Sequence, residues 1–259
     1  MSKLIHKTAI IDAKAELASD VTVGPYSVIG PDVKIDAGTC VGSHVVIKGP
    51  TTIGKDNKIF QFASIGEDPQ DLKYQGGETR LEIGDRNRIR ECVTINRGTE
   101  LGGAVTKIGD DNLLMAYTHI AHDCILHNHL VLATHVSVAG HVTIGDHAVL
   151  GGFSGVHQFC HIGAYSFAAA GSMIPKDILP YTKVSGYYAK PFGLNVVGLQ
   201  RHQFAEKTIA CLKNAYRIVY RQDLKVTEAV DELVKIRAIC PEVDLMINVL
   251  KNSERGVVR

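Results

Sequence analysis

Two neighbouring histidines in the middle of this 259-residue chain could do acid–base chemistry. They lie in the run His119-Ile-Ala-His-Asp-Cys124, in which Asp123 directly follows His122. Imidazole can remove a proton from a hydroxyl at neutral pH, and a nearby carboxylate can fix its tautomer and raise its basicity. Adjacent residues of a strand point to opposite faces, so a contact between His122 and Asp123 requires a corner in the backbone.

The element that must carry these residues is a six-residue repeat with an aliphatic residue at every sixth position. Its first run is Ile5, Ile11, Leu17, Val23, Ile29, Ile35, Val41, Ile47, Ile53, Ile59 and Ile65, and the register later resumes at Ile83 and at Ile108. This pattern predicts a parallel β-helix with three hexapeptides in each coil. Each inward aliphatic stabilises the stack by roughly 1.5–3 kcal/mol. Periodicity alone does not give the handedness, and the general rule would favour right-handed crossovers.

Two insertions interrupt the repeat, near residues 67–82 and 99–107. With the faces labelled A, B and C from Ile5, both insertions leave between faces B and C. The histidines His122, His141 and His157 fall on face B in three successive coils, so they should share one strip of surface with the insertions. Asn57, Asn87 and Asn112 also recur at one position and should stack as an amide ladder.

A second kind of structure follows the repeat. Apolar residues recur at helical spacing over 205–219, 226–233 and 243–250, while 185–193 has the glycines and proline of a linker. The expected domains are a β-helix over residues 1–189 and a helical domain over 190–259.

Composition excludes several classes of protein. With 28 basic and 27 acidic residues the chain lacks the charge expected of a nucleic-acid-binding protein. Six cysteines without a C-x-x-C pair, and charges throughout the first 20 residues, favour a reduced cytoplasmic protein without a signal peptide. Between Cys124 and Pro175 the only acidic or basic residue is Asp146, but seven histidines argue against a membrane span. We favour a subunit interface there over a face buried under the helical domain.

Six segments together carry a family resemblance. They are Gln61–Gly66, Gln70–Tyr74, Ile83–Arg90, His119–Cys124, Val156–Cys160 and Pro191–Asn195. Over essentially its whole length the chain resembles the acyl-carrier-protein:UDP-N-acetylglucosamine O-acyltransferases of lipid A biosynthesis. The resemblance implies a left-handed parallel β-helix and a cytoplasmic homotrimer with active sites between subunits. It also implies transfer of an (R)-3-hydroxyacyl group from the phosphopantetheine of acyl carrier protein to the sugar 3-hydroxyl, with no metal or other cofactor.

The same resemblance implies roles for individual residues. His122 matches the general base, Asp123 orients it, and the Gly140 amide is the oxyanion donor. Matching substrate-binding positions are Asp71, Lys73, His119, His141, His157, Gln158, Asn195 and Arg201. Of these, Asp71 and Lys73 would hold the sugar nucleotide, and Asn195 and Arg201 would lie near the uridine and its phosphates. Ala170, in the small-residue run 168–171, would end the acyl groove and set the chain length.

Three positions depart from the family pattern. Asn96 stands where a histidine is common, Val197 replaces an acidic residue, and His202 replaces the second of two arginines. These departures leave the nucleotide contacts open. The sequence also does not decide the acyl length or whether a 3-amino sugar nucleotide is the acceptor. One alternative is a zinc hydratase of the gamma carbonic anhydrase type, in which three histidines bind the metal. A non-catalytic solenoid scaffold is the other.

Overall fold

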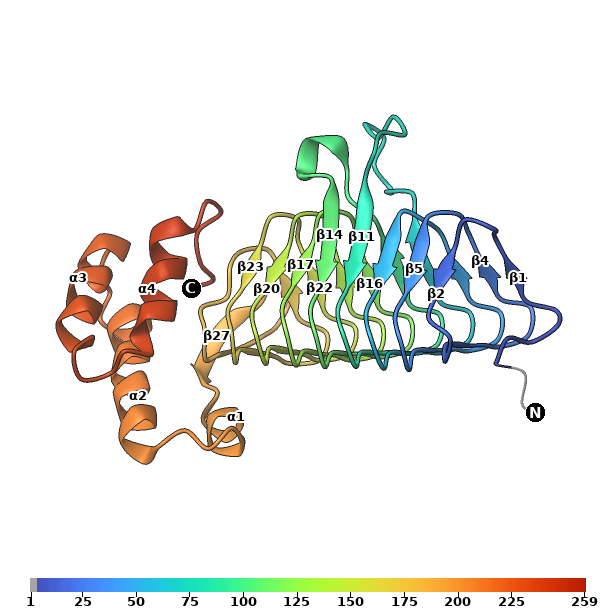
Figure 1. The fold of residues 1–259 in the computed structure, drawn as a ribbon. Coiled ribbons are helices and arrows are strands. Elements are labelled where there is room, and N and C mark those ends of the chain that lie inside the picture. The colour runs from blue at the N-terminus through green and yellow to red at the C-terminus, as the bar shows by residue number, and fades with distance from the viewer. Residues whose placement is uncertain (1–3) are drawn as a thin grey trace.

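The computed structural model describes residues 4–259, which form a long triangular solenoid with helices at its C-terminal end (Figure 1). Its coils wind as a left-handed parallel β-helix, whose three faces are three sheets. Face B contains β1 (Ile10–Ile11), β4 (Val28–Ile29), β7 (Val46–Ile47), β10 (Ser64–Glu67), β13 (Thr94–Asn96), β16 (His119–Ile120), β19 (Ser137–Val138), β22 (Gly155–Val156) and β25 (Met173–Ile174).

The other two faces follow the same order along the axis. Face C contains β2 (Glu16–Leu17), β5 (Val33–Ile35), β8 (Thr51–Ile53), β11 (Arg80–Ile83), β14 (Val105–Ile108), β17 (Ile125–Leu126), β20 (Thr143–Ile144) and β23 (His161–Ile162). Face A contains β3 (Thr22–Val23), β6 (Cys40–Val41), β9 (Lys58–Ile59), β12 (Arg88–Ile89), β15 (Leu113–Leu114), β18 (Val131–Leu132), β21 (Val149–Leu150), β24 (Phe167–Ala168), β26 (Thr182–Ser185) and β27 (Lys190–Leu194).

The repeat predicted from the sequence is confirmed in register and in core. Each aliphatic pairs with its equivalent one coil away, as Ile120 does with Ile95 and Val138. These side chains fill one continuous core, in which Ile120 and Val138 have no exposed surface. Ile5 is 41% exposed because the first coil has a neighbour on one side only.

The asparagine ladder exists, but it does not join side chain to side chain. Asn57 Oδ1 accepts from the Asn87 N–H at 2.9 Å, and Asn87 Oδ1 accepts from the Asn112 N–H at 2.9 Å. All three asparagines are buried. The ladder therefore satisfies main-chain amides at the coil corners, where the strands leave them unpaired.

The segment expected to be a linker, 185–193, is instead part of a hairpin. Strands β26 and β27 pair antiparallel across the turn at Gly186, whose φ is +107°. The prediction was wrong because glycines and prolines mark a tight hairpin turn as well as a linker. The hairpin extends face A to its end.

Helices at the C-terminal end form a second core. The three amphipathic stretches are confirmed as α2 (Glu206–Arg221), α3 (Val226–Ile236) and α4 (Val243–Asn252), and a short α1 (Val196–Arg201) precedes them. Their core includes Leu179 and Tyr181 from the last coil, so it packs directly onto the solenoid. Among residues 4–259, none of the helices has the length and apolar character that a membrane crossing requires.

Candidate active site

Both insertions rise from the edge between faces B and C. The first joins β10 to β11 and the second joins β13 to β14, and they stand next to each other on the solenoid (Figure 1). The second contains a single 3₁₀ turn, Glu100–Gly102. The corners that follow β16, β19 and β22 lie on the same edge. The predicted convergence of histidines and insertions is therefore confirmed.

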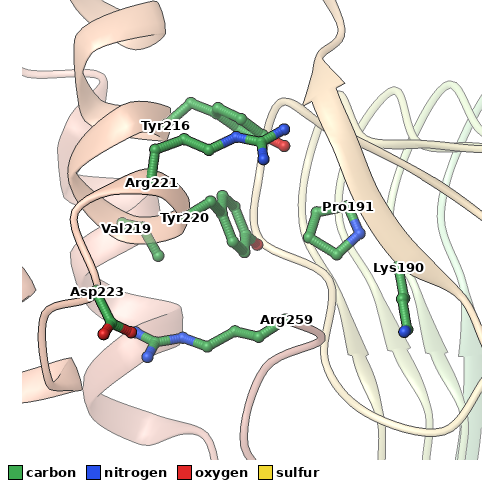
Figure 2. Close-up of a pocket in the computed structure, with 8 residues that line it drawn as sticks. All are labelled: Lys190, Pro191, Tyr216, Val219, Tyr220, Arg221, Asp223 and Arg259. Carbon is green, nitrogen blue, oxygen red and sulfur yellow. The ribbon is translucent and has the colours of Figure 1, made fainter.

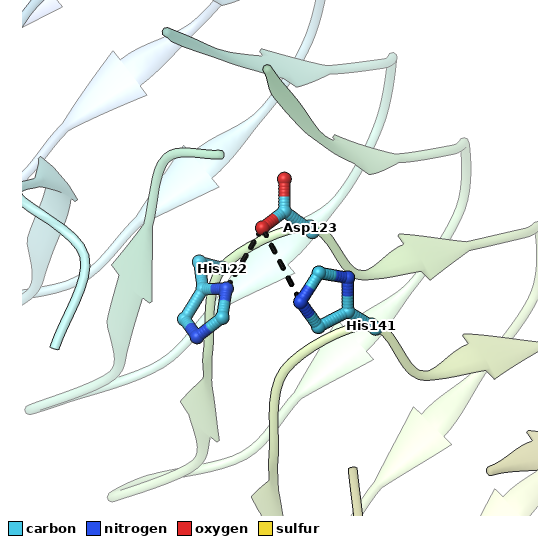
Figure 3. A group of neighbouring side chains, drawn as sticks. All are labelled: His122, Asp123 and His141. Carbon is cyan, nitrogen blue, oxygen red and sulfur yellow. Dashed lines mark hydrogen bonds and ion pairs between the residues drawn. The ribbon is translucent and has the colours of Figure 1, made fainter. Parts of the chain in front are cut away.

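His122 and Asp123 occupy one of these corners and contact each other. His122 Nδ1 lies 2.8 Å from Asp123 Oδ2, and the rings of His122 and His141 both face this oxygen (Figure 3). Asp123 has a φ of +59°, which is the corner conformation that lets adjacent side chains meet. The Asp123 side chain has no exposed surface and that of His122 is 12% exposed. The ring therefore has one nitrogen on the carboxylate and the other free for a substrate.

The histidines around this pair are held mainly in their neutral form. Burial lowers the pKa of His119, and the nearby His122 lowers it further. Burial is also the main cause of the lowered pKa of His141, which Asp123 and Asp71 oppose. His141 Nε2 lies 3.8 Å from Asp123 Oδ2, beyond hydrogen-bond range. A neutral His141 and His119 can bind polar substrate groups without competing for the proton.

Gly140 lies beside the His122 ring. A β-carbon at this position would lie 2.6 Å from His122 Cε1, so any larger residue would push on the His122 ring. The coil ladder pairs the N–H groups of Ala139 and His141, but none of residues 4–259 accepts from the Gly140 N–H. This amide is therefore available to a substrate oxygen.

The first insertion brings Asp71 close enough to His141 for its charge to act on that ring. Asp71 Oδ1 accepts from the Lys73 N–H at 2.9 Å, and the Lys73 side chain is exposed. Arg97, which the sequence analysis missed, anchors this insertion by donating to Gly66 O at 2.9 Å and to the Tyr74 hydroxyl at 3.0 Å. Its only signal in the sequence was its place at the start of the second insertion.

Asn96 shares this anchoring role. Its Nδ2 donates to Asp68 O at 2.7 Å, and the residue is buried. The asparagine that stands in place of the common histidine therefore holds the start of the first insertion.

His157, Gln158 and Ala170 lie further along the axis. His157 borders an apolar cavity of about 230 Å³ together with Gly155, Met173 and Tyr188. Gln158 is exposed at the corner after β22, and Ala170 is exposed at the corner between β24 and β25. Ala170 is thus at the far end of the solenoid from the insertions, three residues before Met173.

Asn195 and Arg201 lie apart from His122. They line a cavity of about 290 Å³ against face A. Val197 and His202, which differ from the family pattern, line the same cavity. Asn195 also caps α1, because its Oδ1 accepts from the Gly198 N–H at 3.2 Å. Within one chain the sequence-predicted residues therefore form two separate groups on different faces, and Ala170 lies apart from both on the edge between faces A and B.

A cavity beside the C-terminal helices has different chemistry. Figure 2 shows this cavity of about 450 Å³ between α2 and β27, bordered by the tyrosines 216 and 220 and by three cationic side chains. Asp223 is its one acidic residue, and no histidine borders it. It offers no paired acid and base, so we place the chemistry at His122.

Comparisons with known proteins agree with this site and fold. Residues 177–258 match the family model described as "Udp N-acetylglucosamine O-acyltransferase; Domain 2", and residues 14–49 match the bacterial transferase hexapeptide repeat. The acyl-[acyl-carrier-protein]–UDP-N-acetylglucosamine O-acyltransferase of Pseudomonas putida (strain W619) is 52% identical over 98% of this chain and 99% of its own.

Solved structures give the same result. The LpxA structure from Acinetobacter baumannii is 52% identical, covers 99% of this chain and 100% of its own, and superposes with a TM-score of 0.98. The UDP-N-acetylglucosamine O-acyltransferase of Moraxella catarrhalis is 50% identical over the same shares, also with a TM-score of 0.98.

The repeat, the corner histidine and the carboxylate define a hexapeptide-repeat acyltransferase. Identity of this level over the full length then settles the family. The chain belongs to the acyl-[acyl-carrier-protein]–UDP-N-acetylglucosamine O-acyltransferases.

Proposed function

We propose that this protein transfers an (R)-3-hydroxyacyl group from acyl carrier protein to the glucosamine 3-hydroxyl of UDP-N-acetylglucosamine, in the first step of lipid A biosynthesis in the cytoplasm. The observation that carries the proposal is the His122–Asp123 contact of 2.8 Å at the edge where both insertions stand. The family to which the chain belongs supports the two substrates.

His122 is the general base in this proposal. Its Nδ1 donates to Asp123, which leaves Nε2 unprotonated and able to take the proton of the attacking hydroxyl. A carbon–oxygen bond then forms at the thioester carbonyl and the carbon–sulfur bond breaks. The proton passes from His122 to the departing thiolate, so the ring returns to its starting state.

Gly140 stabilises the charge that develops on the thioester oxygen. No residue of 4–259 accepts from its N–H, which belongs to the corner that packs on the ring of the base. Thioesters are reactive enough that the base and one oxyanion donor provide the necessary chemistry without a metal or other cofactor.

The remaining predicted residues bind substrates. Asp71 and Lys73 hold the sugar nucleotide from the first insertion, while His119, His141, His157 and Gln158 contact it or the acyl group along the edge between faces B and C. Ala170 ends the groove for the acyl chain. A glycine at this position would admit the longest acyl chains and a methionine only short ones, so alanine should accept medium-length chains close to the limit set by glycine.

A homotrimer explains why the predicted residues form two groups. Asn195 and Arg201 lie against face A, whereas His122 lies between faces B and C, so a neighbouring subunit can bring the two groups together. Phe153 and Phe159 are exposed by 67% and 49% within the charge-poor stretch 124–175. Such apolar, uncharged surface suits a subunit interface.

The decisive experiment measures acyl transfer by His122→Ala. Its rate should fall by about 10²–10⁴-fold, because a general base is lost. His129→Ala is the matched control, since His129 is an exposed corner histidine that stacks on His147 at 4.7 Å. Both variants should elute as trimers. Near-full activity of His122→Ala would disprove this mechanism.

A chelator tests the zinc alternative in the same assay. Ligand atoms of His122, Asp123 and His141 lie within 4.8 Å of one another. However, both Asp123 oxygens already accept hydrogen bonds from protein donors. We expect full transfer activity after chelation, whereas bound zinc in a purified protein that transfers no acyl group would favour the hydratase.

A further inference from the structure

We propose that Thr99 is a positioning residue, which holds the Asp123 carboxylate in the orientation that His122 needs. This inference rests on the proposed role of His122 as the base. Thr99 lies at the start of the second insertion, so this insertion helps to orient the catalytic pair.

Thr99 contacts both oxygens of the carboxylate. Its N–H donates to Asp123 Oδ1 at 2.9 Å, and its Oγ1–H donates to Oδ2 at 2.6 Å. The second of these oxygens is the one that accepts from His122. Thr99 is only 4% exposed and the carboxylate is fully buried, so bulk water has no access to replace these bonds.

The Thr99 hydroxyl bonds to Asp123 and does not cap the 3₁₀ turn that it precedes. Thr99 is the N-cap residue of the 3₁₀ turn, a position where threonine usually accepts from a free N–H of the helix. No such side-chain bond forms here. The insertion instead closes on the Thr99 carbonyl, which accepts from Gly102 at 3.1 Å and from Ala104 at 2.9 Å.

Gly102 closes the other side of the carboxylate. A β-carbon at this position would lie 2.2 Å from Asp123 Cγ, so the turn packs directly on the carboxylate. The Asp123 main chain is fixed separately, by its N–H donating to Thr106 Oγ1 at 2.8 Å. The Thr99 hydroxyl therefore governs the side-chain orientation of Asp123 rather than the path of its backbone.

The test is Thr99→Val, which keeps the β-branch and the N–H but removes the hydroxyl. We expect kcat to fall about tenfold or more, because a hydrogen bond to a charged group is lost. The KM for UDP-N-acetylglucosamine should stay within about twofold, because the Thr99 hydroxyl bonds to Asp123 and not to a residue proposed to bind substrate. Thr99→Ser restores the hydroxyl and should restore most of kcat.

Thr39→Val is the matched control. It removes a buried hydroxyl that donates to Gly54 O at 2.8 Å, far along the chain from the site. This variant should lower the Tm without lowering kcat. If Thr99→Val lowers the Tm as Thr39→Val does and kcat changes by less than about twofold, Thr99 is merely structural and the proposal is wrong.

A double variant separates positioning from an independent effect. In an Asp123→Ala background, Thr99→Val should cost no further activity, because the group it orients is gone. An equal loss in both backgrounds would overturn the proposal. If His122→Ala is inactive while Thr99→Val has the wild-type kcat, only this inference fails. An active His122→Ala would instead reject the proposed function.

Discussion

Gly140 packs so closely on the His122 ring that a β-carbon at this position would lie 2.6 Å from Cε1 and 2.8 Å from Nε2. His122 lies at the corner after β16 and Gly140 at the corner after β19, the next strand of face B. A methyl group at residue 140 would therefore push on a ring that is held in place by Asp123.

Gly140→Ala should therefore lower kcat by about 10²-fold or more, because the methyl group displaces the base and the oxyanion donor together. Gly140 has no positive φ, so the fold should tolerate alanine. Far-ultraviolet circular dichroism and the trimer mass should match the wild type. Activity close to the wild type would contradict the assigned positions of both groups.

Lys73→Ala should mainly raise the KM for UDP-N-acetylglucosamine, by about tenfold. The exposed ammonium makes no hydrogen bond or ion pair among residues 4–259, and in the proposed function it binds the sugar nucleotide. Lys58→Ala removes an exposed lysine on face A and is the control. An unchanged KM with a lower Tm would mark the insertion as structural.

The sequence predicts most of this fold because a repeat is local information. Six-residue spacing identifies the inward side chains, and spacing of three and four identifies α2, α3 and α4. The β26–β27 hairpin was missed because its strands pair antiparallel, and the six-residue spacing predicts only parallel pairing between coils.

The residues of the candidate site also differ in whether local sequence predicts them. His122 and Asp123 were found because they are adjacent, and the repeat placed His141 and His157 on the same edge. Thr99 and Arg97 were not found, because their partners lie 24 and 31 residues away across folded insertions. Those contacts depend on how each insertion folds back, which the hexapeptide register does not encode.

Stability should fall in mildly acid solution because of His161, which is half-buried and lines a cavity with residues of α4. Burial lowers its pKa below the ordinary 6.5, although Asp177 raises it and His127 lowers it further. The unfolded chain then binds more protons than the folded one below about pH 6.5. This contribution to stability is complete above that pH and is lost as the pH falls towards the depressed pKa.

His161→Gln should flatten this dependence. Urea unfolding of both proteins at one concentration, at about pH 5.5, 6.5 and 7.5, measures the change, since assembly makes stability concentration-dependent. His129→Gln, at an exposed corner, is the control and should keep the wild-type slope. The same slope in His161→Gln and the wild type would show that other groups cause the acid sensitivity.

Ala170 gives the last prediction, which concerns acyl length. The residue is exposed at the corner between β24 and β25, next to αL Gly171, so a longer side chain can extend from this corner without displacing the core. If the acyl chain ends here, Ala170→Met fills the space that its last carbons occupy. Each methylene kept out of an apolar groove costs about 0.8 kcal/mol, so two carbons correspond to a change on the order of tenfold.

Competition between acyl carrier proteins with chains of different length measures this effect. Ala170→Met should shift the ratio of kcat/KM values towards the shorter chain, while the KM for the sugar nucleotide stays the same. Ala13→Met, at an exposed corner near the opposite end of the solenoid, is the matched control and should leave the ratio unchanged. An unchanged ratio in Ala170→Met would mean that the groove ends elsewhere, with the apolar cavity beside Met173 and Tyr188 the next place to test.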